Sequence, residues 1–202
     1  MIECMTTGSF FTNSYIISND KNECVIVDPG LNYGNVAKYI KSKYDVKAIL
    51  LTHAHLDHID GIQFFLDTPI YISDIEYNNL FDNDVTLYDT IGRISPYNEG
   101  MLNIIKVKHN DIIKLIGYEF KVLFTPGHTN GSICYLMGDV LFSGDTLFNN
   151  SIGRTDFPTG SMKSMKESLN YLMTLDDNIK VYPGHNDETT IGYEKNNNYW
   201  LK

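Results

Sequence analysis

The residues of this chain best suited to metal chemistry are five of its six histidines. Three of them lie in the stretch "THAHLDHIDG", and two follow apolar runs much later in the chain, whereas His109 lies in a polar turn and is assigned no role. Imidazole and carboxylate bind borderline metals such as zinc, and a catalytic site keeps a coordination position open for water. The sequence therefore predicts a catalytic metal site. Its candidate ligands are His53, His55, Asp57, His58, His128, Asp145 and His185.

The spacing of the first cluster indicates how one short motif can serve two ions. His53 and His55 are two residues apart, so in an extended segment both imidazoles project to one side and can share an ion. Asp57 and His58 follow after the chain turns, and they point in other directions. We therefore expect two neighbouring ions, each completed by a residue from a remote part of the chain.

Short β-branched or aromatic runs recur along the chain and predict strands. These runs cover residues 14–18, 24–28, 47–52, 70–73, 104–108, 118–125, 132–137, 140–144 and 180–184. Helical spacing predicts helices over 35–42 and 161–174, the second capped by Ser161, and shorter ones near 62–66 and 74–80. This mixture favours an α+β fold in which two sheets pack together with helices outside them.

Every candidate ligand follows the C-terminal end of a predicted strand. Because such ends can meet at one edge of a sheet, we expect residues that are far apart in sequence to converge there. Asp28 in "VDPG" occupies a similar place. It is expected to support a metal ligand, to form the turn before Pro29, or both.

The composition favours one globular domain over residues 1–202. Hydrophobic residues make up 43% and charged residues 20%, far from the composition of disordered chains. The net charge of -9 disfavours a nucleic-acid partner. No apolar run has the length of a membrane span, so we expect a cytoplasmic protein without a membrane partner. The cysteines, Cys4, Cys24 and Cys134, are expected to be buried and reduced.

Five motifs resemble those of a known family. "THAHLDHIDG", "TPGHTNGS", "FSGDTLF" and "VYPGHNDET" resemble the metallo-β-lactamase-fold hydrolases, and "SIGRTDFPTGS" resembles their glyoxalase II-like (hydroxyacylglutathione hydrolase-like) branch. The resemblance implies a four-layer αββα sandwich with two mixed sheets, outer helices and the metals at one sheet edge. It also implies the ligand sets: His53, His55 and His128 for the first ion, Asp57, His58 and His185 for the second, with Asp145 and a hydroxide between them.

The chemistry expected of such a site is hydrolysis. Two divalent ions about 3.5–4 Å apart lower the pKa of a bridging water to about 7. A thioester suits this site because its thiolate leaves with a conjugate-acid pKa of about 8.5. We therefore expect a thioesterase for small molecules of the S-lactoylglutathione type, with Asp57 and Asp145 as catalytic residues beside the metal-bound hydroxide. The expected cofactors are two zinc ions, with iron or manganese as alternatives.

The binding of the thiol carrier is where the chain departs from this family. Full-length glyoxalase II carries a C-terminal helical extension that contributes to glutathione binding, whereas this chain ends soon after His185. Arg154, Phe148 and Tyr193 are the candidate substrate contacts. For Arg154, a buried ion pair with Asp156 that shapes the loop is the favoured alternative, and for the two aromatic residues it is packing.

Three other functions stay open at this point. A glyoxalase II-like sulfur dioxygenase keeps a similar ligand set and a "GRTDF" stretch, but uses a single iron to oxidise a persulfide. A lactonase would use the same hydroxide. A non-catalytic, metal-stabilised binding module is disfavoured, because structural zinc sites are closed four-ligand cages built with cysteines.

Overall fold

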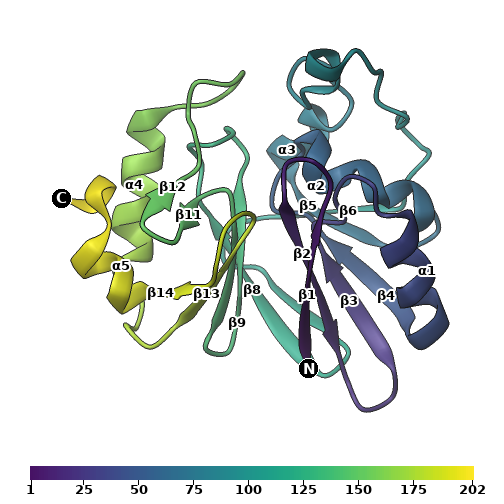
Figure 1. The fold of residues 1–202 in the computed structure, drawn as a ribbon, viewed down its shortest axis with the longest axis horizontal. Helices are drawn as coiled ribbons and strands as arrows, with labels where there is room; N and C mark the ends of the chain where they lie inside the picture. Colours follow the sequence, from purple (N-terminus) through teal and green to yellow (C-terminus); the bar gives the residue numbers. More distant parts are fainter.

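Two six-stranded sheets face each other in the computed structural model, which describes residues 1–202 (Figure 1). The first sheet has the order β1-β2-β3-β4-β5-β6, with β3 to β6 mutually parallel. Its strands are β1 (Ile2–Thr7), β2 (Thr12–Ser18), β3 (Glu23–Val27), β4 (Asp45–Leu50), β5 (Ile70–Ser73) and β6 (Ile104–Val107).

The second sheet has the order β14-β13-β10-β9-β8-β7 and is also mixed, because β10 and β13 are parallel while their other neighbours are antiparallel. Its strands are β7 (Ile112–Leu115), β8 (Tyr118–Phe124), β9 (Ile133–Met137), β10 (Val140–Gly144), β13 (Lys180–Pro183) and β14 (Thr189–Thr190). A separate two-residue pair joins β11 (Leu147–Phe148) to β12 (Ser151–Ile152).

Helices lie on the outer faces of the two sheets and form part of the connections between strands (Figure 1). The α-helices are α1 (Gly34–Lys43), α2 (Leu56–Ile59), α3 (Asp74–Asn79), α4 (Met162–Leu172) and α5 (Ile191–Asn197), and the 3₁₀ turns are η1 (Asp60–Phe64), η2 (Tyr88–Ile91) and η3 (Tyr199–Leu201). Ser161 caps α4 as predicted, since its hydroxyl accepts a hydrogen bond from Ser164 N. No helix has both the length and the apolar character needed to cross a bilayer.

The alternating side chains of the strands build three apolar layers. On β2, Tyr15 and Ile17 join the cluster between the two sheets, whereas Ile16 points the other way and packs with Ala37 and Ile40 of α1. Both faces of this strand are therefore buried, which explains its continuous apolar run. A third cluster lies between α4 and the second sheet. The four-layer αββα architecture expected from the sequence is confirmed.

The nine predicted strands and the two longer predicted helices are all present, but several elements were missed. Strand β1 lies at a sheet edge and most of its residues are partly or fully exposed, so it has no apolar alternation. Cys4 on this strand is exposed, which corrects the expectation of a buried thiol, while Cys24 and Cys134 are buried. The segment near the C-terminus, for which no element was predicted, forms α5, and Trp200 beyond it is 43% exposed.

Candidate metal centre

The candidate ligands lie where strands of the two sheets end at one edge of the molecule. Strand β4 leads into the loop that carries His53 and His55, and α2 carries Asp57 and His58. In the second sheet, His128 follows β8, Asp145 follows β10 and His185 follows β13. All seven predicted residues are brought together, because these strands run in the same direction within their sheets.

Three imidazoles form the first group. The side chains of His53, His55 and His128 are all buried, and one nitrogen from each lies within 4.8 Å of the others. His55 Nδ1 and His128 Nε2 are 2.8 Å apart. The group therefore offers three nitrogen donors that converge on one point.

Two imidazoles and a carboxylate form the second group. Asp57 Oδ2 is 3.6 Å from His58 Nε2 and 3.3 Å from His185 Nε2. Thr12 Oγ1 donates a hydrogen bond of 2.7 Å to the same carboxylate oxygen and so fixes its position. Phe10 O accepts a hydrogen bond from His185 Nδ1 at 3.1 Å, which turns His185 Nε2 toward the group.

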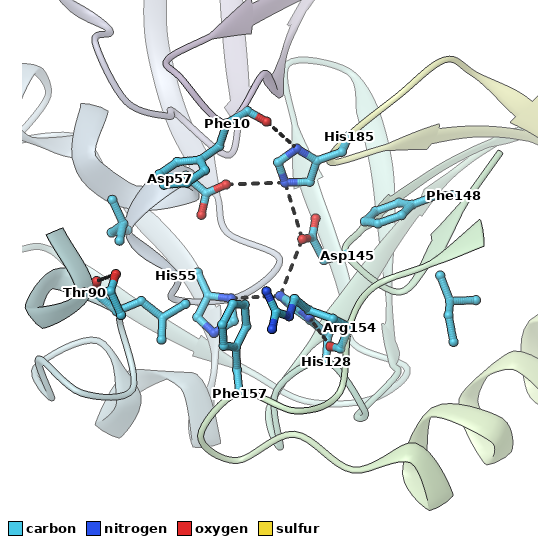
Figure 2. A pocket seen from close by; sticks show the side chains of 13 residues that line it. Phe10, His55, Asp57, Thr90, His128, Asp145, Phe148, Arg154, Phe157 and His185 are labelled. Carbon is cyan, nitrogen blue, oxygen red and sulfur yellow. Dashed lines mark hydrogen bonds and ion pairs between the residues drawn. The ribbon is translucent and has the colours of Figure 1, made fainter. Parts of the chain in front are cut away.

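Asp145 lies between the two groups (Figure 2). Its Oδ2 is 3.4 Å from His128 Nε2 in the first group and 3.4 Å from His185 Nε2 in the second, and its Oδ1 is 3.4 Å from His58 Nε2. Gly184 permits this approach, because a Cβ there would lie 2.2 Å from Asp145 Oδ1. One carboxylate can therefore serve both groups.

The unpaired atoms and the spacing of the donor atoms are suited to binding divalent cations. Five buried side-chain polar atoms of the chain have no hydrogen-bond partner, and four of them are here: His53 Nε2, His55 Nε2, His58 Nε2 and Asp145 Oδ1. Unpaired buried polar atoms are costly, and cations bound by the two groups would pair His53 Nε2, His58 Nε2 and Asp145 Oδ1. Two ligand atoms bound at 2.0–2.1 Å to one tetrahedral ion lie about 3.3 Å apart. The distances around Asp57 and Asp145, from 3.3 to 3.6 Å, are close to this spacing.

Asp28 supports ligands of both groups through buried hydrogen bonds. Its Oδ2 accepts from His58 Nδ1 at 3.0 Å and from the Thr52 hydroxyl at 2.7 Å. Because Thr52 donates its only hydroxyl proton to Asp28, it accepts from His53 Nδ1, which is 3.0 Å away. The Nε2 atoms of His53 and His58 are thereby left free for metal. Asp28 also adopts a left-handed backbone (φ 50°) before Pro29, so it serves as a turn residue as well.

Burial keeps the first group uncharged. It lowers the pKa of His53 and of His128 and lowers the pKa of His55 to about 3. The neighbouring imidazoles lower the pKa of His53 and His55 further. Neutral imidazole is the form that binds metal, so these residues need not release protons before binding.

Asp57 of the second group and the shared Asp145 carry the negative charge of the site. Burial opposes ionisation of Asp57 and Asp145, but His58 and His185 outweigh it and hold the pKa of both carboxyls below the usual value. Burial likewise opposes the charging of His185, yet Asp145 and Asp57 raise its pKa to about 10. The carboxylates therefore require positive charge at this position, either as protons on histidine or as metal ions.

A cavity of about 500 Å³ opens above the ligands (Figure 2). This volume is within the range typical of small-molecule sites. Besides five of the candidate ligands, its lining is mostly apolar, and its other polar side chains are Thr90 and Arg154. The apolar residues are Phe10, Leu56, Leu87, Phe148, Ile152 and Phe157.

The three predicted substrate contacts differ in position. Phe148 lines the cavity edge-on to His185, with ring centroids 5.8 Å apart. Arg154 also lines it, but both its Nε and Nη2 donate to Asp156 at 2.7 Å. This pair is exposed, which corrects the expectation of a buried one, with side chains 59% and 66% accessible. Tyr193 lies outside the cavity beside Asn150, so the structure does not place it among the substrate contacts.

Several lining residues were not predicted from the sequence. Phe10 lies in the turn between β1 and β2, Leu87 precedes η2, and Phe157 lies in the loop before α4. The Phe157 ring packs edge-on to His55, with centroids 5.6 Å apart, and beneath the Arg154 guanidinium, 3.9 Å from its centroid. Of these three residues only Phe157 lies in a motif that the sequence analysis considered, "GRTDF", and there Arg154 was the predicted substrate contact.

The comparisons with known proteins agree with this geometry. A family model described as the metallo-beta-lactamase superfamily matches residues 7–185. A probable metallo-hydrolase of Streptococcus pyogenes is 36% identical over an alignment of 200 positions that covers 92% of this chain and 84% of the relative. The hydroxyacylglutathione hydrolase GloC of Haemophilus influenzae is 33% identical over an alignment of 214 positions that covers 99% of this chain and 97% of the relative.

Solved structures share the whole fold. The BLEG-1 B3 metallo-beta-lactamase has a TM-score of 0.88 at 32% identity, covering 100% of this chain and 99% of its own. TTHA1623, solved in a di-iron-bound form, has a TM-score of 0.83 at 30% identity, covering 98% of this chain and 100% of its own. With the family match, the fold and the clustered histidines and aspartates in agreement, this chain belongs to the metallo-β-lactamase superfamily.

Proposed function

We propose that this protein is a binuclear metal-dependent hydrolase that cleaves small-molecule thioesters. The observation that carries the proposal is the position of Asp145, whose carboxylate lies 3.4 Å from nitrogens of both ligand groups beneath an open cavity. Two divalent ions bound there would lower the pKa of a water between them and polarise a substrate carbonyl. The seven ligands exceed what one tetrahedral ion needs, which favours two.

The side chains of the site have separable roles in this proposal. Asp145 ties the two groups together, and Asp57, fixed by Thr12, balances positive charge in the second group. Phe148 and Phe157 flank the ligands on the cavity wall and exclude water from the substrate. The protein thereby supplies a dry, shaped surface beside a charged floor.

The lack of a general acid among the other lining residues favours a thioester over an oxygen ester as the substrate. Apart from the ligands, the polar lining side chains are Thr90 and Arg154, and neither gives up a proton near neutral pH. A leaving group must therefore depart without help from a general acid. A thiolate, with a conjugate-acid pKa of about 8.5, departs more readily than an alkoxide, which is a much stronger base. The name of the Haemophilus influenzae relative, a hydroxyacylglutathione hydrolase, supports the same class of bond.

The experiment that tests this function compares matched substrates. Protein loaded with zinc, iron or manganese is offered a hydroxyacyl thioester and the oxygen ester of the same acyl group. We expect release of the thiol and at least about a tenfold preference in kcat/KM for the thioester. Equal rates, a preference for a lactone, or no hydrolysis with any metal would contradict the proposal.

A single-iron sulfur dioxygenase is the competing function, and the di-iron-bound relative gives a reason to include iron in the test. Oxygen uptake separates the two chemistries, because hydrolysis consumes none. One iron per chain together with oxygen consumption on a glutathione persulfide would replace the hydrolase proposal with the dioxygenase.

A further inference from the structure

A buried carboxylate lies behind the first ligand group, on the side away from the cavity lining. Glu76 is on α3, is 0% exposed and accepts four hydrogen bonds. Its Oε2 accepts from Ala54 N at 2.8 Å. Its Oε1 accepts from the side chains of Thr129 and Asn79 and from Gly131 N at 3.2 Å. Four donors and no cation thus converge on one side chain.

Glu76 joins the two loops that carry the first ligand group. Ala54 lies between His53 and His55, and Thr129 directly follows His128. One oxygen of the carboxylate therefore holds the loop after β4, and the other holds the loop after β8. The distance between the two loops is therefore fixed in part by the width of the Glu76 carboxylate.

The loop after β8 packs so closely against Glu76 that there is no room for an additional side-chain atom. A Cβ at Gly131 would lie 2.7 Å from Glu76 Oε1 and 2.8 Å from Glu76 N, so the loop reaches the helix only because glycine is there. Ser73, the N-cap residue of α3, donates a further hydrogen bond of 2.7 Å to Gly131 O. The loop is therefore clamped through both its N–H and its C=O groups.

The buried carboxylate is costly, which indicates that its contacts serve more than packing. Burial raises the pKa of Glu76, and the surrounding donors oppose this rise. An apolar side chain would fill the same space without that cost, but it would leave the N–H groups of Ala54 and Gly131 unpaired.

We propose that Glu76 is a positioning residue for the first metal ion: it sets the spacing of His53 and His55 relative to His128. This inference rests on the metal centre of the proposed function. It acts through the backbone of the ligand loops, so Glu76 itself contacts neither ion nor substrate. Supporting partners of metal ligands commonly contribute tenfold to hundredfold in metal affinity.

The substitution Glu76→Gln tests the role because it keeps the shape and removes one acceptor. Whichever way the amide turns, its NH₂ group faces a donor, either Ala54 N–H or the trio on the other side. The matched control is Glu194→Gln. Glu194 is also 0% exposed and accepts three hydrogen bonds, from Asn150 N and from the side chains of Thr189 and Asn198, none of which carries a ligand.

The measurement is a titration of metal-free protein with Co²⁺, followed by the absorption bands of the bound ion. We expect wild type and Glu194→Gln to bind two ions with matching affinities, and Glu76→Gln to bind one of them about tenfold more weakly. Equal loss in both variants would overturn the proposal, because the effect would then be one of general stability. No loss in either would overturn it as well, because Glu76 would then have no influence on metal affinity. No substrate is present, so failure here is distinct from failure to hydrolyse thioesters.

A second variant covers the case in which Glu76→Gln does not fold. Thr129→Val removes one donor to Glu76 and keeps the volume of the side chain. We expect a smaller loss, about threefold, in the affinity of the same ion. Unchanged affinity for both ions in Thr129→Val would count against the role of Glu76.

Discussion

The floor of the cavity, formed by the candidate metal ligands, and its rim, formed by the apolar lining residues and Arg154, are built in different ways. On the floor, the ligands follow strand ends, and buried residues such as Asp28 and Glu76 hold the ligands or their loops through hydrogen bonds. On the rim, Phe10, Leu87 and Phe157 come from loops and contribute apolar surface. Reaction chemistry and substrate choice therefore depend on different side chains, so the side chains of the rim can be replaced without disturbing the metal centre.

The largest effect is expected on the floor, from Asp145→Asn. An amide offers one oxygen and no negative charge where the carboxylate faces both ligand groups, so kcat should fall roughly 100- to 1000-fold. Steady-state kinetics with metal-loaded protein check this. A fall below fivefold would show that the chemistry does not depend on a shared carboxylate.

The next effect concerns the support of the floor. Asp28→Asn weakens the hydrogen bond to His58 Nδ1 and disturbs the link through Thr52 to His53. Metal affinity should therefore fall about tenfold or more. Competition with a chromogenic chelator measures it, and an unchanged affinity would show that the ligands hold their positions without Asp28.

A rim substitution should change binding and leave the floor intact. Phe148→Ala removes an aromatic wall beside His185, so KM for an apolar thioester should rise about tenfold while kcat and the number of bound ions stay the same. Kinetics and metal analysis are measured on the same preparation. Loss of an ion in this variant would contradict the separation of rim from floor.

The smallest effect is expected from Asp156→Asn on the outer rim. It frees the Arg154 guanidinium from its exposed ion pair, which should raise kcat/KM about two- to threefold for a thioester with a carboxylate in its thiol part. A neutral thioester with the same acyl group is the control and should not respond. An equal response to both would rule out a charge effect.

The sequence predicted the floor far better than the rim. Histidines and aspartates that follow apolar runs stand out, because strand ends meet at a sheet edge, and the structure brings all seven together. Rim residues such as Phe10 and Leu87 carry no such signal, since only tertiary packing brings their loops to the cavity.

Two further failures have a local cause. Glu76 is on a short helix, where glutamate is normally solvated, and nothing in the sequence indicates that its neighbours would be loop N–H groups. The Arg154 and Asp156 pair was expected from its spacing, but spacing does not determine exposure, and the pair lies on the surface.

The dependence of thioester hydrolysis on two bound ions can be measured by adding zinc in steps to metal-free protein while following thiol release from a hydroxyacyl thioester. We expect hydrolysis to rise with the second ion and to saturate at two ions per chain. Saturation at one ion, or no hydrolysis with two ions bound, would show that the proposed binuclear mechanism is wrong.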